Sequence, residues 1–442
     1  MTTPLAAVVM AAGLGTRMKS ARPKHLHSLL GRRMVDWALD AVRPLAASPL
    51  VVVSSPETRE ELAADGVEVA VQAEPRGTGD AVAAAREALE GFEGDVLVLP
   101  GDSPLVTTEV LQAVVEAQRQ NEAAVTLLAV ETDRPLPYGR IVRDEAGAVR
   151  RIVEERDATD EERAIRELNA SFYAFSAPDL WWALDRLDPA NAQGELYLTD
   201  TVGHLVEAGR TIAVATTKDV DAVHGVNTRV DLAHAASVLR SRVLTAHMLA
   251  GVTIADPATT WIEATVELEP DTVVHPYTTL RGRTRVAAGA EVGPHVVADD
   301  AEIGPRATVG PFAYLRPGAT LAADSKVGAF VEVKNARIGE RTKVPHLSYI
   351  GDAEIGEDTN IGAGAITANY RPERHAGKQR TVIGRNVHTG SDNVFVAPVE
   401  IGDDAWIAAG STITEDVPPG ALAVARARQI VKENYVDGER ND

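Results

Sequence analysis

The sequence predicts an α/β domain, a connecting helix and a solenoid of short parallel strands, in that order along 442 residues. Three observations carry this prediction: apolar runs alternate with helix-like stretches up to about residue 226, a helical pattern follows, and a six-residue period begins beyond residue 252. Because the chain is longer than one hydrophobic core usually supports, we expect domains at 1–226 and 252–442, with a linker at 227–251.

Within the first 226 residues, short apolar runs are predicted to form a mainly parallel sheet covered by helices. Helix-like stretches at 79–89 and 107–118 separate some of these runs. The run that begins at Leu5 has no basic flank before it and leads into a glycine loop, so we interpret it as a buried strand and not as a signal peptide. The expected strands are 6–10, 50–54, 67–72, 96–100 and 124–130.

The linker is predicted to be a helix. Thr228 followed by Asp231 resembles a capping box, and apolar residues from Leu232 to Leu249 keep a roughly helical spacing before Gly251. We expect the arginines of this helix to form a solvated face.

Beyond residue 252, aliphatic residues recur every six positions, first in the register of Val274 and then in that of Val309 and Leu315. A small residue stands two places before most of them, as Ala313 does before Leu315. Because residues two apart in a strand face the same side, both point inward, and stacked identical rungs form a regular solenoid. We also expect part of a coil to be missing near residues 293–303.

The composition is that of a globular chain that binds small ligands. Apolar residues make up 45% and charged residues 24% of the sequence, and the formal net charge is -20. This charge disfavours nonspecific attraction to nucleic acid or to an anionic membrane, and no apolar run approaches the length that spans a bilayer. The absence of cysteine excludes disulfides and thiolate metal sites. We expect a cytoplasmic protein with local basic pockets, no nucleic-acid partner and no membrane insertion.

A loop after the first strand carries two glycines and two cations. Gly13 and Gly15 let the backbone approach a ligand and direct N–H groups at phosphates, and Arg17 and Lys24 add positive charge. Met18 stands where the dinucleotide fingerprint has its third glycine, and no Walker-type lysine follows, so neither a dehydrogenase nor a P-loop ATPase fits. Without further motifs, the simpler interpretation of either cation is an ordinary surface charge.

The string AAGLGTRM at 11–18, followed by Pro23-Lys24, resembles the signature of sugar-nucleotide pyrophosphorylases. Together with the repeats, nearly the entire chain resembles the bifunctional N-acetylglucosamine-1-phosphate uridyltransferase/glucosamine-1-phosphate acetyltransferase family. The resemblance implies a Rossmann-like nucleotidyltransferase domain, a connector helix and a left-handed parallel β-helix. Further matching segments follow in order: Gln72, Gly77-Thr78-Gly79, Gly101-Asp102, Tyr138-Gly139-Arg140, Glu154, Asn169 and Gly225-Val226-Asn227.

The resemblance implies roles for residues of the N-terminal half. Arg17 and Lys24 would face the triphosphate as catalytic cations, and Asp102 and Asn227 would hold Mg²⁺. The nucleotide and the sugar would be bound by Met10, Ala11, Ala12, Gly13, Gln72, Gly77, Thr78, Gly101, Gly139, Glu154 and Asn169.

These residue types suit nucleotidyl transfer. A sugar phosphate that attacks the α-phosphorus of UTP brings two anions together and expels pyrophosphate, so the site must supply positive charge and in-line positioning. One carboxylate and one amide suit Mg²⁺, which keeps water and phosphate oxygens for its other positions. The alternative interpretations are a turn or helix cap for Asp102 and a cap of the linker helix for Asn227. His25 and His27 are expected to be structural.

One segment departs from the family pattern. Where the family usually has threonine or serine and then glycine after the sugar-binding asparagine, this chain has Ala170-Ser171. We expect these two side chains to crowd or reshape the sugar pocket.

A histidine of the repeat domain is predicted to lie outside the solenoid. In the segment 344–350, Val344, Ser348 and Ile350 take the inward register, which leaves His346 off the interior. That removes the commonest alternative, a core histidine. Because imidazole, with an ordinary pKa of about 6.5, can accept a proton near neutral pH, His346 is a candidate general base.

The same resemblance implies partners for His346 in acetyl transfer to glucosamine 1-phosphate. Arg316 and Lys334 would bind the sugar phosphate, while Tyr349 and Asn360 would position the sugar. The family also implies a homotrimer with the acetyl-transfer sites between neighbouring subunits. The loop 371–380 is longer than is usual in the family and lacks its Asp-Gly turn. Acetyl-CoA would be contacted by Ala363, Asn369, Tyr370, Ser391, Ala409 and Arg426.

We therefore predict a bifunctional enzyme that acetylates glucosamine 1-phosphate with acetyl-CoA and then transfers UMP from UTP to the product. This gives UDP-N-acetylglucosamine and pyrophosphate, for cell-envelope synthesis. The main alternative is a nucleotidyltransferase for another sugar 1-phosphate, with a noncatalytic trimerising β-helix. A further alternative is a noncatalytic ligand-sensing or structural protein, and the presence of Asp102, Asn227 and His346 argues against it.

Overall fold

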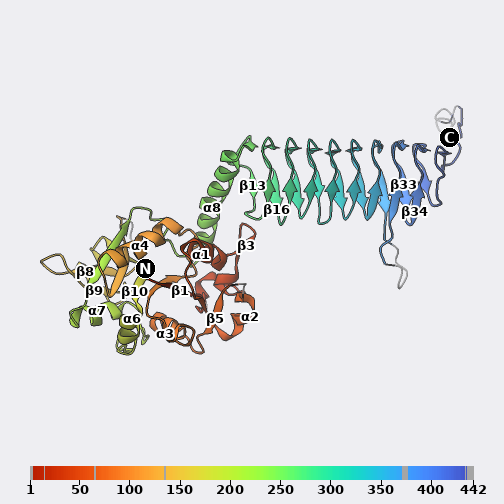
Figure 1. Ribbon diagram of the computed structural model, residues 1–442. Coiled ribbons are helices and arrows are strands. Elements are labelled where there is room, and N and C mark those ends of the chain that lie inside the picture. The colour runs from red at the N-terminus through yellow and green to blue at the C-terminus, as the bar shows by residue number, and fades with distance from the viewer. Residues whose placement is uncertain are drawn as a thin grey trace, which may run out of the picture. The chain divides into compact units, whose positions relative to one another are not determined.

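A computed structural model of the chain describes residues 3–433 and 435, apart from 14, 64–65, 134–135 and 371–376. The chain divides into two compact units, Met1–Leu239 and Arg240–Asp442, which we call the first and the second unit (Figure 1). The division falls inside helix α8 (Arg229–Leu249). The domain limits that the sequence suggests stay predictions.

The first unit is built on a mixed sheet, with strands in the order β11-β7-β10-β6-β1-β4-β5 and a β8-β9 hairpin attached through β10. β4 and β6 run parallel to β1, while β10 runs antiparallel to β6 and β7. The strands are β1 (Leu5–Met10), β4 (Leu50–Ser54), β5 (Glu68–Val71), β6 (Asp95–Pro100), β7 (Val125–Glu131), β8 (Arg140–Arg143), β9 (Val149–Val153), β10 (Glu167–Ser176) and β11 (Ile212–Thr217), with β2 (Ser28–Leu29) pairing β3 (Arg32–Arg33) apart from them. The helices are α1 (Met34–Val42), α2 (Arg59–Leu62), α3 (Thr78–Ala83), α4 (Thr108–Gln120), α5 (Asp160–Arg163), α6 (Ala177–Leu184) and α7 (Asp200–Glu207).

Two hydrophobic cores lie on the two faces of this sheet. Along β1, Ala7 and Val9 belong to the core that includes residues of α1 and α4, whereas Ala6 and Val8 belong to the core that includes residues of α3, α6 and α7. Every residue of β1 before Met10 is buried, which explains why the strand is an unbroken apolar run. The strand ends of β1 and β6 come together where Met10 pairs with Pro100.

The predicted strands of the first unit are all observed, with ends that shift by at most one residue. The predicted helix at 79–89 is divided into α3 and a 3₁₀ turn at Glu87–Leu89. Strands β8, β9, β10 and β11 of this sheet were not predicted. Arginines interrupt the apolar pattern of β8 and β9: Arg143, Arg150 and Arg151 are exposed, whereas Arg140 is buried.

The second unit is a parallel β-helix with three faces, as the six-residue period predicts (Figure 1). The small and the branched residue of each rung both point inward; Ala313 and Leu315, for example, are buried. One face holds β12 (Thr253–Ile254), β15 (Val273–Val274), β18 (Glu291–Val292), β21 (Thr308–Val309), β24 (Lys326–Ala329), β27 (Lys343–His346) and then β32 (His388–Thr389), β35 (Trp406–Ile407) and β37 (Leu422–Ala423).

The other two faces complete each coil. The second holds β13 (Trp261–Ile262), β16 (Thr279–Arg281), β19 (Val297–Asp299), β22 (Tyr314–Leu315), β25 (Glu332–Lys334), β28 (Tyr349–Gly351), β30 (Ile366–Ala368), β33 (Val394–Val396) and β36 (Thr412–Ile413). The third holds β14 (Glu267–Leu268), β17 (Arg285–Val286), β20 (Glu302–Ile303), β23 (Thr320–Leu321), β26 (Arg337–Ile338), β29 (Ala353–Ile355), β31 (Thr381–Ile383) and β34 (Val399–Ile401).

The prediction that part of a coil is missing near residues 293–303 is wrong. Leu280 pairs with Ala298, and Val286 pairs with Ile303, so the strands of this coil continue the sheets. The interval from Ala298 to Ile303 is one residue shorter than that from Leu280 to Val286. The register change in the sequence therefore marks a shorter corner between two complete strands.

Helix α8 begins with the predicted capping box. The Asp231 carboxylate accepts a hydrogen bond from the Thr228 N–H over 2.7 Å, and Thr228 Oγ1 accepts one from the Asp231 N–H over 3.2 Å. The same carboxylate accepts the Asn227 N–H over 3.0 Å, so the cap also holds the backbone of Asn227. Among the described residues, no helix is both long and apolar enough to cross a bilayer.

Candidate active sites

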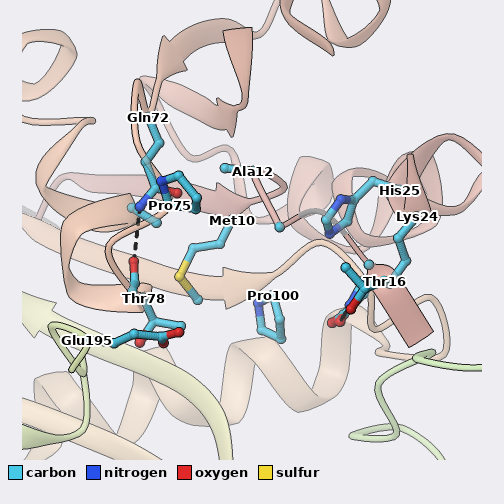
Figure 2. Close-up of a pocket in the computed structure, with 15 residues that line it drawn as sticks. Met10, Ala12, Thr16, Lys24, His25, Gln72, Pro75, Thr78, Pro100 and Glu195 are labelled. Carbon is cyan, nitrogen blue, oxygen red and sulfur yellow. Dashed lines mark hydrogen bonds and ion pairs between the residues drawn. The ribbon is translucent and has the colours of Figure 1, made fainter. Parts of the chain in front are cut away.

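A cavity of about 470 Å³ opens at the ends of β1 and β6 in the first unit (Figure 2). Figure 2 shows Met10 and Pro100 in its middle, with Gln72 and Thr78 on one side and Lys24 on the other. Ligands of open α/β sheets usually bind at such strand ends. The sequence-predicted residues that line the cavity are Met10, Ala12, Gly13, Lys24, Gln72, Gly77, Thr78 and Asp102.

The two glycines of the loop after β1 meet different structural requirements. Gly15 has a φ of 63°, and a Cβ there would clash with the side chain of Lys24, so only glycine fits without strain. Gly13 is exposed, and a Cβ there would meet only the ring of His25, at 4.0 Å. The open space beside Gly13 leaves its backbone accessible from the cavity.

Lys24, one of the two predicted phosphate cations, contacts both predicted metal ligands. Its Nζ pairs with Asp102 Oδ2 and lies 3.2 Å from Asn227 Oδ1, and Arg17 Nη2 donates to the same Asn227 oxygen over 2.8 Å. Lys24 is buried, whereas Arg17 is exposed. Burial works to raise the pKa of Asp102, but the charge of Lys24 opposes it, and the resulting pKa lies below the usual range. Asp102 is therefore ionised at neutral pH.

The two oxygen ligands fit a hard divalent cation. The Val226 N–H donates to the carbonyl of Asp102 over 2.8 Å, which fixes the two segments together. A Cβ on Gly225 would lie 3.5 Å from Asp102 Oδ1, so the absence of a side chain there keeps the carboxylate accessible. One carboxylate and one amide oxygen already share the lysine ammonium, and such oxygen ligands are those that Mg²⁺ prefers.

His25, which is expected to be structural, is one of the residues that line the cavity. It is buried beside the cavity, and burial first, then the charge of Lys24, lowers its pKa to about 4 despite the opposing effect of Asp102. The ring is therefore neutral at physiological pH and adds no charge to the site.

The three predicted sugar ligands lie together next to β10. The Asn169 N–H donates to the carbonyl of Gly139 over 2.8 Å, and a Cβ on Gly139 would lie 3.6 Å from Glu154 Oε1. Thr199 Oγ1 donates to the same Glu154 oxygen over 2.9 Å. Burial raises the pKa of Glu154 above its ordinary value.

The departure at Ala170-Ser171 lies in an irregular turn of β10. The pairing of β10 with β7 shifts between Asn169 and Tyr173, and Ser171 has a φ of 64°. The Ser171 N–H donates to Asn169 Oδ1 over 3.3 Å, and Asn169 Nδ2 donates to the Tyr173 hydroxyl over 2.7 Å. The turn therefore orients the asparagine amide, and a residue with a side chain occupies a backbone conformation that favours glycine.

Sequence reasoning missed two polar residues of this region. Thr199 bonds Glu154, and Tyr197 is buried with its hydroxyl unpartnered among the described residues. Burial first, and then nearby carboxylates, raises the pKa of Tyr197 to about 12. Both residues could have been found from one sequence pattern. In the segment 195–200, polar residues alternate with Leu196 and Leu198, and the segment belongs to no predicted helix or strand.

In the second unit, His346 lies outside the solenoid as predicted. Val344, Ser348 and Ile350 are buried, and His346 is exposed at the end of β27. Its backbone is fixed because its carbonyl accepts the Ser348 hydroxyl over 2.7 Å and the Gly364 N–H over 3.3 Å. The ring is thus accessible on a rigid turn.

Two predicted phosphate ligands lie on neighbouring coils of one face. Arg316 follows β22, and its N–H donates to the carbonyl of Val333, the residue before Lys334. Arg316 Nη1 pairs with Glu332 Oε1 at 2.7 Å. The register places Lys334 beside Gly351, which ends the strand that begins with Tyr349.

Lys378 is a third cation of this group, and sequence reasoning missed it. The adjacent ammonium of Lys378 and then the guanidinium of Arg316 lower the pKa of Lys334, which indicates like charges held close together. Lys378 belongs to the loop 371–380, in which residues 371–376 lie outside the described ones. The available signal was a lysine close after Asn369-Tyr370, a pair predicted to contact acetyl-CoA.

Three predicted acetyl-CoA residues form a column beside His346 at one corner. Gly364 bonds the carbonyl of His346, the Asp392 N–H donates to Ala363 O over 2.7 Å, and the Gly410 N–H donates to Ser391 O over 2.8 Å. Ala363, Ser391 and Ala409 therefore stand on successive coils.

The other predicted residues of the second unit lie near this column or on the neighbouring face. A Cβ on Gly410 would lie 3.9 Å from Arg426 Cδ, and Asn360 pairs with Lys343 and His388 in adjacent coils. Asn369 Nδ2 lies 3.5 Å from the Tyr349 hydroxyl, and Tyr370 is exposed.

Comparison with known proteins relates both units to described families. The model of the MobA-like NTP transferase domain matches residues 7–171, and that of the hexapeptide repeat of succinyl-transferase matches residues 380–415. A Streptomyces avermitilis protein named "Bifunctional protein GlmU" is 49% identical, covering 99% of this chain and 95% of the relative. Proteins of the same name from Trichlorobacter lovleyi and Mycobacterium bovis are 45% and 47% identical, over 99% and 100% of this chain and 99% and 94% of the relatives.

Proposed function

The chain belongs to the family of bifunctional GlmU proteins, and from that membership we propose which residues of its two units perform the two reactions. The enzyme acetylates glucosamine 1-phosphate with acetyl-CoA and transfers UMP from UTP to N-acetylglucosamine 1-phosphate, which releases UDP-N-acetylglucosamine and pyrophosphate. The observation that most supports the assignment is the grouping of candidate residues around one cavity in the first unit and on neighbouring coils in the second.

For uridylyl transfer, we propose that the nucleotide lies across the ends of β1 and β6. Gln72 and Thr78 would contact the base. Lys24 on the opposite side of the cavity, and Arg17, which bonds Asn227, would neutralise the charge that develops on the leaving pyrophosphate. Glu154 and Asn169 would hold the acceptor sugar so that its phosphate is in line with the α-phosphorus.

Asp102 and Asn227 are the proposed ligands of Mg²⁺. Their oxygens already share a cation, the Lys24 ammonium, which supports a preference for positive charge at this point. When bound, the metal ion supplies positive charge to the phosphates. Lys24 would then be free to contact phosphate oxygens.

For acetyl transfer, His346 is the proposed general base. The amine of glucosamine 1-phosphate attacks the thioester carbon, an N–C bond forms and the C–S bond breaks, and the amine proton passes to the imidazole and then to the departing thiolate. Arg316, Lys334 and Lys378 would bind the sugar phosphate, because three cations held this closely favour a dianion. Tyr349 and Asn360 would position the sugar, and the column from Ala363 to Ala409 would carry the coenzyme.

We further propose that the enzyme is a cytoplasmic homotrimer. The hexapeptide repeat supports an assembly through the second unit, and His346 and its neighbours lie on an exposed surface that another subunit would complete.

Two variants test the assignment when each reaction is assayed by itself. With acetyl-CoA and glucosamine 1-phosphate, His346→Ala should abolish thiol release and Asp102→Ala should leave it intact. With UTP, Mg²⁺ and N-acetylglucosamine 1-phosphate, only Asp102→Ala should block pyrophosphate release. His275→Ala, at another histidine of the second unit that pairs with Glu291, is the matched control.

Loss of both reactions in either folded variant would contradict separate sites. Pyrophosphate release without any acetyl-CoA consumption by the unmodified enzyme would instead favour the alternative with a noncatalytic β-helix.

A further inference from the structure

One amide side chain stands between the cavity of the first unit and a second cavity of about 410 Å³. Gln72 follows β5, is buried and lines both cavities; Figure 2 shows it in the first. Its backbone N–H donates to the carbonyl of Ser54 over 2.9 Å, which fixes it to the neighbouring strand β4. Gln72 is therefore held firmly where the proposed function places the nucleobase.

Both protons of the Gln72 amide nitrogen are already used. Nε2 donates to the carbonyl of Gly77 over 3.1 Å and to Asp80 Oδ2 over 2.8 Å. Oε1 accepts no hydrogen bond from the residues that the structure describes, and it is not one of their buried, unpartnered polar atoms. Because a primary amide nitrogen has two N–H groups, only the oxygen of this amide is left for a ligand.

The two partners of Nε2 allow a single orientation of the amide. A carbonyl and a carboxylate are acceptors, so a rotated amide would place Oε1 against two oxygens. The carbonyl of Gly77 is itself fixed, because it also accepts the Ala81 N–H over 3.1 Å in the first turn of α3. The carboxylate of Asp80 supplies the shorter of the two bonds to the amide.

An exposed arginine holds this carboxylate in place. Asp80 Oδ1 accepts a hydrogen bond from Arg76 Nη2 over 2.8 Å, while Oδ2 accepts the one from Gln72. The side chain of Asp80 is 12% exposed and that of Arg76 is 65% exposed. An ion pair with so exposed a member contributes little to stability by itself. Its geometry nevertheless gives each carboxylate oxygen its own donor and leaves Oδ2 directed at Gln72.

We propose that Asp80 is a positioning residue that fixes the Gln72 amide with its oxygen towards the nucleobase, and that this orientation selects uracil over cytosine. Uracil carries an N–H at ring position 3, which donates to Oε1. Cytosine has an unprotonated nitrogen at that position, so two acceptors would meet and neither would be paired. The inference rests on the proposed contact between Gln72 and the base, and it adds the residue that determines which amide atom makes that contact.

The first experiment compares UTP with CTP in pyrophosphate release with Mg²⁺ and N-acetylglucosamine 1-phosphate. The unmodified enzyme should have a kcat/KM about 100-fold higher for UTP, and Asp80→Ala should reduce this ratio about tenfold, because one of the two bonds that orient the amide is lost. Asp80→Asn keeps an oxygen for Gln72 Nε2 and should retain most of the preference. Asp185→Ala, which breaks the ion pair of another aspartate with Arg86, is the matched control and should leave the ratio unchanged.

A merely structural role of Asp80 would lower kcat/KM for the two nucleotides alike. An unchanged ratio in Asp80→Ala therefore overturns the proposal, whatever the activity of that variant. Equal use of UTP and CTP by the unmodified enzyme also overturns it, but leaves the proposed reactions standing. No pyrophosphate release from either nucleotide would overturn the proposed uridylyl transfer, and this inference with it.

A double-mutant cycle tests whether Asp80 acts through Gln72. Gln72→Ala should itself lower the preference for UTP, because the oriented oxygen is gone. Asp80→Ala in that background should then cause no further loss, since no amide remains to be positioned. A further tenfold loss in the double variant would show that Asp80 acts without Gln72, and would overturn the proposal.

Discussion

The first unit holds an oppositely charged pair, Lys24 and Asp102, in its cavity, whereas the second unit presents its proposed charged ligands on the outside of a solenoid. Lys24 is buried and Asp102, from a different segment, is partly buried beside it, so each charge compensates the other. Lys334 and Lys378 carry like charges side by side near the surface. A substitution of Lys24 or Asp102 should therefore leave the other charge without its partner. A substitution of Lys334 or Lys378 should relieve the repulsion between the two ammonium groups and weaken only ligand binding.

The largest expected effect is that of Lys24→Met. It removes a proposed phosphate ligand and deprives the partly buried Asp102 of its partner, so uridylyl transfer should fall by about 10²–10³-fold while acetyl transfer is unchanged. Steady-state assays of the two half-reactions measure this. Lys19→Met, at an exposed lysine that follows the same loop, is the control. Equal losses in both reactions would show that the buried pair supports the whole chain and not one site.

The neutral His25 should make the first unit sensitive to acid. The unfolded chain takes up a proton at this residue near pH 6.5, but the folded chain does so only near pH 4. Stability is therefore complete above pH 6.5, and the free energy of unfolding should fall by about 3 kcal/mol as the pH drops through this window. Urea unfolding at several pH values measures the effect. His25→Gln should remove most of this dependence, and the exposed His234→Gln should not.

A smaller effect is expected in the second site for Lys378→Ala. A hydrogen bond to a charged group contributes about 1.5–3 kcal/mol, so the KM for glucosamine 1-phosphate should rise about tenfold or more while that for acetyl-CoA stays constant. The pKa of Lys334 should rise, because its nearest like charge is gone. Arg380→Ala, which breaks the pair with Glu354 in the same segment, is the control. A matching rise in the KM for acetyl-CoA would indicate a role in loop structure instead.

The smallest expected effect is that of Ser171→Gly. Glycine adopts the left-handed backbone of this turn without strain, so the free energy of unfolding should increase by about 0.5–1 kcal/mol. Thermal unfolding measures the change. Ser171→Ala keeps the strain and should bring no gain. A Ser171→Gly enzyme with lower stability would mean that the serine side chain makes a compensating contact.

The sequence predicts the second unit better than the first because each coil repeats the same local rule. The small or branched residue types at positions such as Ala313 and Leu315 show that these positions face inward. The same alternation places His346 outside the solenoid. This rule does not determine the length of a corner. A corner that is one residue shorter was therefore predicted to be a missing part of a coil near residues 293–303. In the first unit, the apolar strands were predictable from burial on both faces.

Long-range contacts were harder to predict in both units. The β8-β9 hairpin has an exposed side with arginines, so its pattern is weak. The contacts of Thr199 with Glu154 and of Lys378 with Lys334 join segments that only the folded chain brings together. The sequence therefore predicted the type of reaction at each site better than it predicted every residue that contributes to the site.

Corner length varies along the solenoid while the strand register continues. After β19 a corner is one residue shorter, and Thr381, the first residue of β31, follows the end of β30 at Ala368 by 13 residues, yet Ala353 still pairs with Thr381 and Ile366 with Val394. Peptide grafts at such bends are consequently expected to be tolerated as outward appendages. Evolution and protein engineering can alter recognition there without rebuilding the scaffold.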